Sequence, residues 1–153
     1  MKVNLSLSYT TILMSIVFIL FLGQPENVVL IHASLAILGS IVANHFHHMA
    51  TDQTNYVMYD VYLHWVPLFL SLALVDPKLI GSRQFLFAAL YPILYLGITS
   101  YRDNNGWTGF KITNPVDHIK EMYPGLDPKV YLLYYVVLIG AYFFRDYLGL
   151  PRA

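Results

Sequence analysis

Asp60 and His64 are the two residues of this sequence whose types and spacing point most directly to chemistry. They lie one helical turn apart in the apolar stretch Tyr59–Pro67. Residues i and i+4 share a helix face, so the Asp60 carboxylate can accept a hydrogen bond from the His64 imidazole. That bond would fix the tautomer of the ring and leave its second nitrogen free as a base or a ligand. Ionisable groups inside a membrane are costly, so such a pair marks a functional site or a buried structural contact.

A candidate nucleophile lies near the amino terminus, in the run Tyr9-Thr10-Thr11. A threonine on a membrane helix usually donates its hydroxyl to a backbone carbonyl one turn back. It becomes a nucleophile only when a base is in reach. If the helices that carry Thr11 and His64 are neighbours, then Thr11, His64 and Asp60 form the nucleophile, base and orienting group of a hydrolytic triad.

A histidine group at His45, His47 and His48 suggests a different chemistry. Imidazole suits zinc and iron, and His32 and His64 would extend the ligand set. However, His45 and His47 are two positions apart, so they point to different faces of a helix. A solvated helix end is the simpler interpretation, so no metal and no cofactor are predicted, and a metal-dependent lipid enzyme is kept as an alternative.

The composition assigns the chain to the integral membrane proteins. Of its 153 residues, 57% are hydrophobic and only 12% are charged, whereas soluble domains carry about 25% charged residues. The net charge is zero, with no basic patch for nucleic acid, and the lack of cysteine excludes disulfides and thiolate catalysis. We expect one multi-pass domain, residues 1–153, whose partners are membrane lipids; the sequence leaves open the compartment and homo- or hetero-oligomers.

The predicted architecture is an all-α, polytopic transmembrane bundle of about five spans. A span needs about 20 mostly apolar residues, and five segments qualify, at about 8–23, 28–46, 56–75, 83–101 and 128–148. A polar loop, 102–127, precedes the last of them and carries a short helix from Asn114-Pro115 to Tyr123. With Lys2 as its only basic residue and no small-x-small motif, the first segment is predicted to be a span rather than a cleaved signal peptide. The basic residues give no useful orientation.

Local residues predict where several of these helices begin, end or bend. Asp127 before Pro128 is a typical helix start, and Ser82 is available to cap the fourth segment. The third segment is expected to stop at Asp76-Pro77. Pro67 and Pro92 lie inside the third and fourth segments, where each removes one backbone donor and should bend its helix.

The order of several motifs resembles a known family. Leu63–Phe69 contains a histidine and a proline, Tyr91–Leu96 begins with Tyr-Pro, and Arg102 and Gly106-Trp107 follow before a polar loop and a last span. Together with Ser8-Tyr9-Thr10-Thr11, this order resembles the androgen-induced membrane hydrolases and their bacterial six-proline relatives. The resemblance covers about residues 56–148, and residues 8–15 more thinly. Members of that family usually have six spans, so we expect this chain to lack the first.

The resemblance implies an intramembrane hydrolase of lipid esters. Animal members of the family hydrolyse fatty-acid esters of hydroxy fatty acids with a threonine nucleophile and a histidine, which correspond by position to Thr11 and His64. The resemblance also implies that an apolar cavity holds the acyl chain. The main alternative is a non-enzymatic membrane scaffold, or a subunit of a larger membrane-bound assembly.

The oxyanion of such a reaction needs a hydrogen-bond donor. Three tyrosines, Tyr9, Tyr91 and Tyr95, are candidates for this substrate-binding role, and the sequence does not choose among them.

Overall fold

The computed structural model describes residues 3–47, 58, 60–105, 110–112, 114–122, 124–147 and 149. Within these ranges the side chains of residues 3–5, 43–47, 103–105, 110–112, 118–119 and 121–122 are outside the description.

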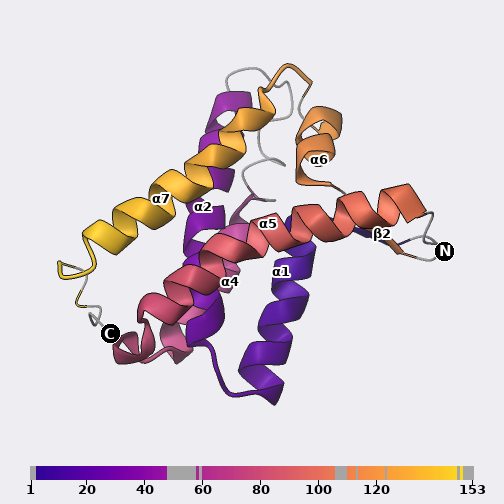
Figure 1. Cartoon of the computed structure of the whole chain (residues 1–153). Coiled ribbons are helices and arrows are strands. Elements are labelled where there is room, and N and C mark those ends of the chain that lie inside the picture. Colours follow the sequence, from indigo (N-terminus) through magenta and orange to yellow (C-terminus); the bar gives the residue numbers. More distant parts are fainter. Residues whose placement is uncertain are drawn as a thin grey trace.

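The described chain is built almost entirely from helices (Figure 1), which confirms the predicted class. In chain order the helical elements are α1 (Leu7–Ile16), the π-helical η1 (Val17–Phe21), α2 (Glu26–His47), the π-helical η2 (Val61–Trp65), α4 (Val66–Leu74), η3 (Pro77–Leu79), α5 (Ser82–Asn105), α6 (Pro115–Met122), η4 (Pro128–Tyr131) and α7 (Leu132–Phe143). Two three-residue strands, β1 (Val3–Leu5) and β2 (Phe110–Ile112), pair in parallel with Val3 opposite Phe110. The sequence did not predict this pairing, because three residues are too few for an alternating pattern to be recognised.

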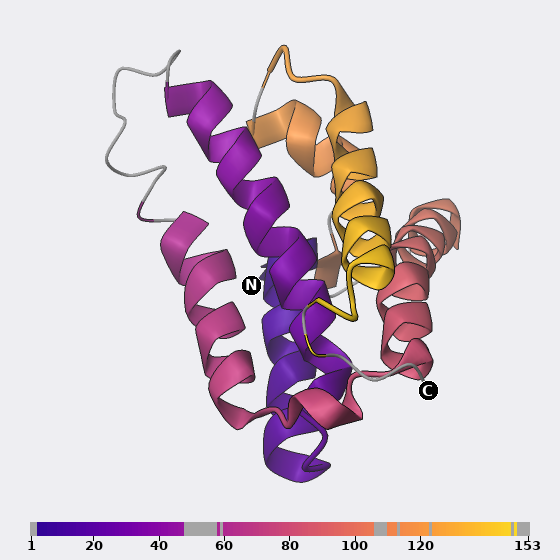
Figure 2. The ribbon, with the colours of Figure 1, turned by 90° about the vertical axis from the view of Figure 1, so that its left-hand side faces the viewer.

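Helix α2 is the centre of the packing (Figure 2). It contacts α1, η2, α4, α5 and α7. A helix that is surrounded in this way must be apolar on several faces rather than along one stripe. The buried apolar residues of α2 are Val28, Val29, Leu30, Ile31, Leu35, Ala36, Leu38 and Val42.

Several predicted helix ends are confirmed in atomic detail. The Asp76 and Asp127 carboxylates accept hydrogen bonds from the backbone N–H groups of Lys78 (3.0 Å) and Lys129 (2.9 Å). Each aspartate precedes a proline and starts a short 3-10 helix. Likewise α6 begins at Pro115, as the Asn114-Pro115 pair predicted.

The cap predicted at Ser82 lies one residue earlier. Helix α5 begins at Ser82 itself, and the N–H of Gly81 donates to the side-chain oxygen of Gln84 at 3.0 Å. A glutamine three residues into a helix that reaches back to the preceding N–H is half of a capping box.

Helix length gives only part of the predicted membrane topology. Among the described residues, one helix, Ser82–Arg102, is long and apolar enough to cross a membrane. Four further apolar helical stretches are shorter: Leu7–Phe21, the Glu26–Val42 part of α2, Val61–Leu74 and Pro128–Phe143. By helix length, the described residues therefore support one of the five predicted spans.

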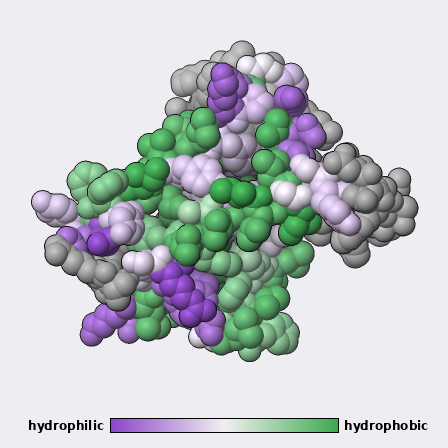
Figure 3. Space-filling model, in the orientation of Figure 1, coloured by the Kyte–Doolittle hydropathy of each residue, from purple (hydrophilic) through white to green (hydrophobic). Residues whose placement is uncertain are grey.

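The outer surface of the helices is strongly apolar. Apolar residues cover much of the face in Figure 3, and hydrophilic residues gather toward its top and lower left. Phe21 is 79% exposed, Phe143 is 75% exposed, and more than half of Phe69 and Ile93 is exposed. These four residues come from four different helical segments, so the apolar surface is not confined to one patch.

Candidate active site

The structure brings His64 and Asp60 together as the sequence predicted. The ring Nδ1 of His64 lies 2.8 Å from Oδ1 of Asp60, and the two side chains are only 16% and 10% exposed. A carboxylate can only accept, so Nδ1 carries the proton and donates it. In the neutral ring this leaves Nε2 as an acceptor.

The backbone around His64 is a π-helix that ends just before Pro67. A proline has no N–H, and its ring clashes with the carbonyl four residues earlier, here that of Leu63. The helix widens over Val61–Trp65, where the N–H of Val66 reaches back five residues to the Val61 carbonyl. Pro67 thus alters the helix next to His64 in place of the simple bend that was expected. Single π-helical turns are frequent at functional sites.

The hydroxyl opposite His64 belongs to Ser8. Its Oγ lies 2.9 Å from Nε2 of His64, and it donates the hydrogen bond because Nε2 is the acceptor in this tautomer. Ser8 sits in the first turn of α1, so α1 and η2 are neighbours at this point. Ser8, His64 and Asp60 thus form a continuous chain of hydrogen bonds with the order of a serine, histidine and aspartate triad.

Thr11, the predicted nucleophile, has other partners. Its Oγ1 lies 2.8 Å from the Leu7 carbonyl oxygen and 3.0 Å from the Tyr91 hydroxyl oxygen, and the side chain is fully buried. The bond to the carbonyl one turn back is the usual structural role of a helical threonine. The predicted catalytic role of Thr11 stays a prediction, whereas the hydroxyl in contact with His64 is three residues earlier, at Ser8.

Helix α2 holds Asp60 from the other side. The Ser40 hydroxyl donates to Oδ2 of Asp60 at 3.1 Å, and the Trp65 indole N–H donates to Ser40 Oγ at 2.7 Å. A Cβ atom at Gly39 would overlap both Oδ1 of Asp60 and Nδ1 of His64. Gly39 therefore lets the pair approach the backbone of α2, and Ser40 fixes the carboxylate. Sequence reasoning missed both residues, although a glycine-serine pair in an apolar helix was a visible signal.

The three tyrosines predicted to bind the oxyanion occupy different environments. The hydroxyl oxygen of Tyr91 is 3.0 Å from Thr11 Oγ1, and Tyr95 is buried. Tyr9 is 41% exposed on the outer side of α1. The substrate-binding roles of the three residues stay predictions.

The first turn of α1 offers another way to stabilise an oxyanion. Backbone N–H groups in the first turn of a helix lack intrahelical acceptors, and the helix dipole favours negative charge there. Ser8 is the second residue of α1, and Ser6, the residue just before the helix, caps it by accepting from the Tyr9 N–H at 3.4 Å. An anion that forms at Ser8 is therefore placed at the favourable end of the helix.

A second pair of histidine and serine is buried two turns farther along α1. Nε2 of His32 lies 2.5 Å from Ser15 Oγ. The Ser15 hydroxyl donates its proton to the Thr11 carbonyl at 2.7 Å. His32 is thus a buried histidine with a hydrogen-bond partner.

Most of the histidines in the alternative metal site lie outside the residues that the structure describes. The side chains of His45 and His47 and the whole of His48 are not among the described residues. Within the described residues, no group of three histidine, aspartate or glutamate side chains could hold a metal ion.

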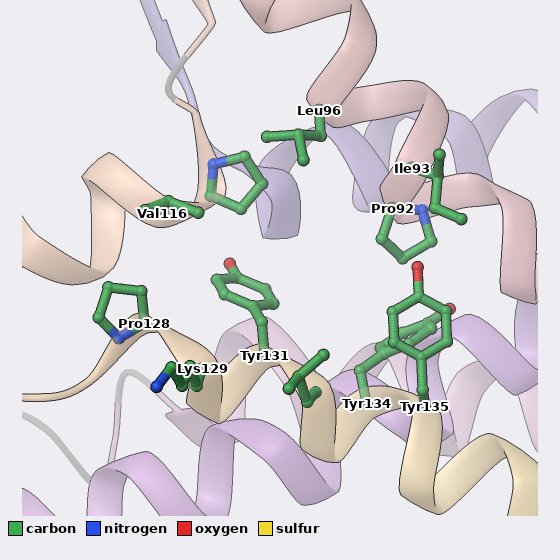
Figure 4. Close-up of a pocket in the computed structure, with 11 residues that line it drawn as sticks. Pro92, Ile93, Leu96, Val116, Pro128, Lys129, Tyr131, Tyr134 and Tyr135 are labelled. Carbon is green, nitrogen blue, oxygen red and sulfur yellow. The ribbon is translucent and has the colours of Figure 1, made fainter.

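A separate cavity of about 410 Å³ lies between α5, α6 and the start of α7. Figure 4 shows the ring of Tyr131 pointing into it, with Val116 on one side and Pro92 and Ile93 on the other. Neither Ser8 nor His64 is among its lining residues. The hydrogen-bonded triad is therefore not part of this cavity.

Comparisons with protein-family models, with curated protein sequences and with solved structures give no match to this chain.

Proposed function

We propose that this protein is a membrane-embedded hydrolase of acyl esters in which Ser8 is the nucleophile, His64 the general base and Asp60 the orienting carboxylate. The observation that carries the proposal is the hydrogen-bond chain from Ser8 Oγ to His64 Nε2 (2.9 Å) and from His64 Nδ1 to Asp60 Oδ1 (2.8 Å). Each of the three roles of a triad is filled by a residue type and a geometry suited to it.

The reaction follows from these contacts. Ser8 Oγ attacks the ester carbonyl carbon while its proton moves to Nε2 of His64, and Asp60 stabilises the imidazolium that forms. The tetrahedral intermediate collapses when His64 gives this proton to the leaving alcohol, which departs and leaves the acyl group on Ser8. Water then attacks the acyl-serine, again with His64 as base, and releases the carboxylic acid and free Ser8.

The apolar exterior supports a location in the membrane. Large side chains such as Leu20, Phe21, Phe69 and Phe143 would face water in a soluble protein, and each is at least 60% exposed. A surface with this much exposed apolar area indicates a membrane or an interface. We therefore propose the five-span topology, with each shorter helix contributing one crossing. A helix of 15 residues is about 22 Å long, so the bilayer would thin locally to match it.

The sequence resemblance to the androgen-induced hydrolases supports the same reaction but implies a different nucleophile. That resemblance places Thr11 in the role, whereas the contact with His64 is made by Ser8. Both residues are on α1, three positions apart on nearly the same face. Substitution of each hydroxyl in turn distinguishes the two assignments.

The test is ester hydrolysis by the purified full chain in detergent micelles, with p-nitrophenyl butyrate as the substrate. We expect Ser8→Ala and His64→Ala each to lower kcat by about a thousandfold or more, because members of a triad act as a unit. Ser100→Ala, an exposed serine on α5, is the matched control and should leave kcat unchanged.

Three other results would change the assignment. If Thr11→Ala abolishes turnover and Ser8→Ala does not, Thr11 is the nucleophile. If the parent chain hydrolyses no ester, the triad is a structural link and a non-enzymatic scaffold becomes the leading function. Loss of activity on treatment with a chelator would favour the metal-dependent alternative.

A further inference from the structure

A cavity of about 280 Å³ lies along the interface between α1 and α4. Its walls are mainly apolar side chains from the second half of α1, from η1 and from α4. They include Ile12, Ile16 and Leu20 from α1 and η1, and Pro67, Leu70 and Leu74 from α4.

The lining of this cavity starts about one helical turn after Ser8 and His64. Helices α1 and α4 run side by side in the same direction (Figure 2), and Ser8 of α1 meets His64 just before α4. The first lining residues are Ile12, one turn after Ser8, and Pro67, nearly one turn after His64. Because residues one turn apart share a helix face, the cavity extends along the same interface as the reacting hydroxyl.

The polar groups in the wall are already engaged. The Ser71 hydroxyl donates to the Pro67 carbonyl at 2.7 Å, and the Ser15 hydroxyl donates to the Thr11 carbonyl at 2.7 Å. His32, the third polar lining residue, contacts Ser15 Oγ. With both hydroxyl protons given to the backbone, the wall suits a plain hydrocarbon.

We propose that this cavity binds the acyl chain of the ester, with its carbonyl carbon at Ser8 and its methyl end toward Leu20 and Leu74. This inference rests on the proposed hydrolase activity and adds the position, direction and length of the chain. From Ser8 to Leu20 the helix advances by about 18 Å at 1.5 Å per residue. An extended chain advances about 1.3 Å per carbon, given a C–C bond of about 1.5 Å. The site therefore accepts straight chains of up to about fourteen carbons.

The experiment measures kcat/KM for p-nitrophenyl esters of four, eight, twelve and sixteen carbons with the full chain in detergent. Each methylene that enters the cavity from water should raise kcat/KM by up to about fourfold, so the value should rise to twelve carbons. It should fall at sixteen carbons, because the end of that chain no longer fits.

Leu70 and Leu72 provide a matched pair of variants. Both are leucines of α4 and both are about half exposed or more, but only Leu70 lines the cavity. Leu70→Trp should block the cavity about 9 Å beyond His64. We expect it to lower kcat/KM for the twelve-carbon ester by about tenfold or more and to leave the four-carbon ester within about twofold. Leu72→Trp should leave both values unchanged.

The outcomes separate this inference from the proposed function. If the parent is active and Leu70→Trp affects all chain lengths equally or none, the acyl chain lies elsewhere and the inference is wrong while the hydrolase remains. If no ester is hydrolysed, a twelve-carbon fatty acid with a terminal diazirine tests the cavity directly. Crosslinks to residues 12–20 and 67–74 would uphold it as a fatty-acyl site, and crosslinks only elsewhere would overturn it.

Discussion

At the scale of single residues, Gly39 carries a constraint that the chemistry of the site does not reveal. It has no catalytic group, yet any larger residue would occupy the space of Asp60 Oδ1 and His64 Nδ1. The Asp60–His64 pair thus lies against the backbone of α2, where the Ser40 hydroxyl donates a further hydrogen bond to Asp60. The position of the base therefore depends on a small residue that is distant in the sequence.

We expect Gly39→Ala to destabilise the protein by about 1–3 kcal/mol, since overpacking forces side chains and backbone to shift. It should also lower kcat, because the displaced His64 loses its alignment with Ser8. Gly97→Ala in α5 is the matched control: nothing lies within 4 Å of the added Cβ, so the variant should gain up to about 1 kcal/mol. Thermal unfolding in detergent and the esterase assay measure the two effects. Equal unfolding temperatures for both variants would contradict the close approach.

We expect Asp60→Asn to lower kcat by up to about ten-thousand-fold while leaving the fold intact. The amide has the size of the carboxylate but carries two N–H groups. The Ser40 hydroxyl and His64 Nδ1 both donate to the Asp60 carboxylate. In the variant, one of these two donors would face the amide N–H groups of Asn instead of an acceptor oxygen. The ring then takes the wrong tautomer, or the pair separates. Kinetics together with circular dichroism check this, and an active variant would show that Asp60 does not orient His64.

At the scale of elements, Pro67 and the π-helix before it set the direction in which His64 points. An alanine at this position supplies the N–H that the Leu63 carbonyl lacks in the native helix, so a regular α-helix becomes available. We expect Pro67→Ala to raise the unfolding temperature and to lower kcat by about ten- to a hundredfold, because a misplacement of about 1 Å has such an effect. Pro92→Ala in α5 is the control, because Pro92 is remote from the triad in sequence and lines the separate cavity. Unchanged kcat in Pro67→Ala would show that the π-helix is not needed for alignment.

The elements also show what the sequence could and could not predict. The spacing of Asp60 and His64 and the aspartate-proline pairs at residues 76–77 and 127–128 are local, and the structure confirms all three. The partner of His64 is not local. Whether Ser8 or Thr11 meets the ring depends on the rotation of α1 about its own axis, which its packing against α2 and η2 decides. The same holds for Gly39, whose role arises only when α2 packs against η2.

At the scale of the whole molecule, a polar site lies inside a bundle whose exterior is apolar. Asp60, His64 and Ser8 lie among helices whose outer faces carry leucine, isoleucine and phenylalanine. Exposure of this apolar surface to water would be unfavourable, whereas its contact with the hydrocarbon core of a bilayer would not. If the protein is embedded in a bilayer as we propose, long-chain esters would concentrate in the same phase and could reach the site from it.

Single-cysteine labelling tests the five-span topology, because the chain has no cysteine of its own. Lys78 lies between the third and fourth predicted spans, and Lys120 lies in the loop before the fifth; both are exposed. We expect Lys78→Cys and Lys120→Cys to react with an impermeant maleimide from opposite sides of sealed vesicles. Labelling of both from one side would contradict an odd number of crossings between them. Release of the parent chain from vesicles without detergent would contradict a membrane-embedded protein.

The most direct test of the central claim is the residue that an alkyl fluorophosphonate modifies in the purified full chain, identified by peptide fragmentation in a mass spectrometer. An activated hydroxyl attacks the phosphorus atom of this reagent and displaces fluoride, so the phosphonate stays covalently bound to the hydroxyl oxygen. If Ser8, His64 and Asp60 work as a triad, the phosphonate will be found on Ser8, and His64→Ala will abolish the labelling. A phosphonate on Thr11, or labelling of Ser8 that persists in His64→Ala, would contradict the account.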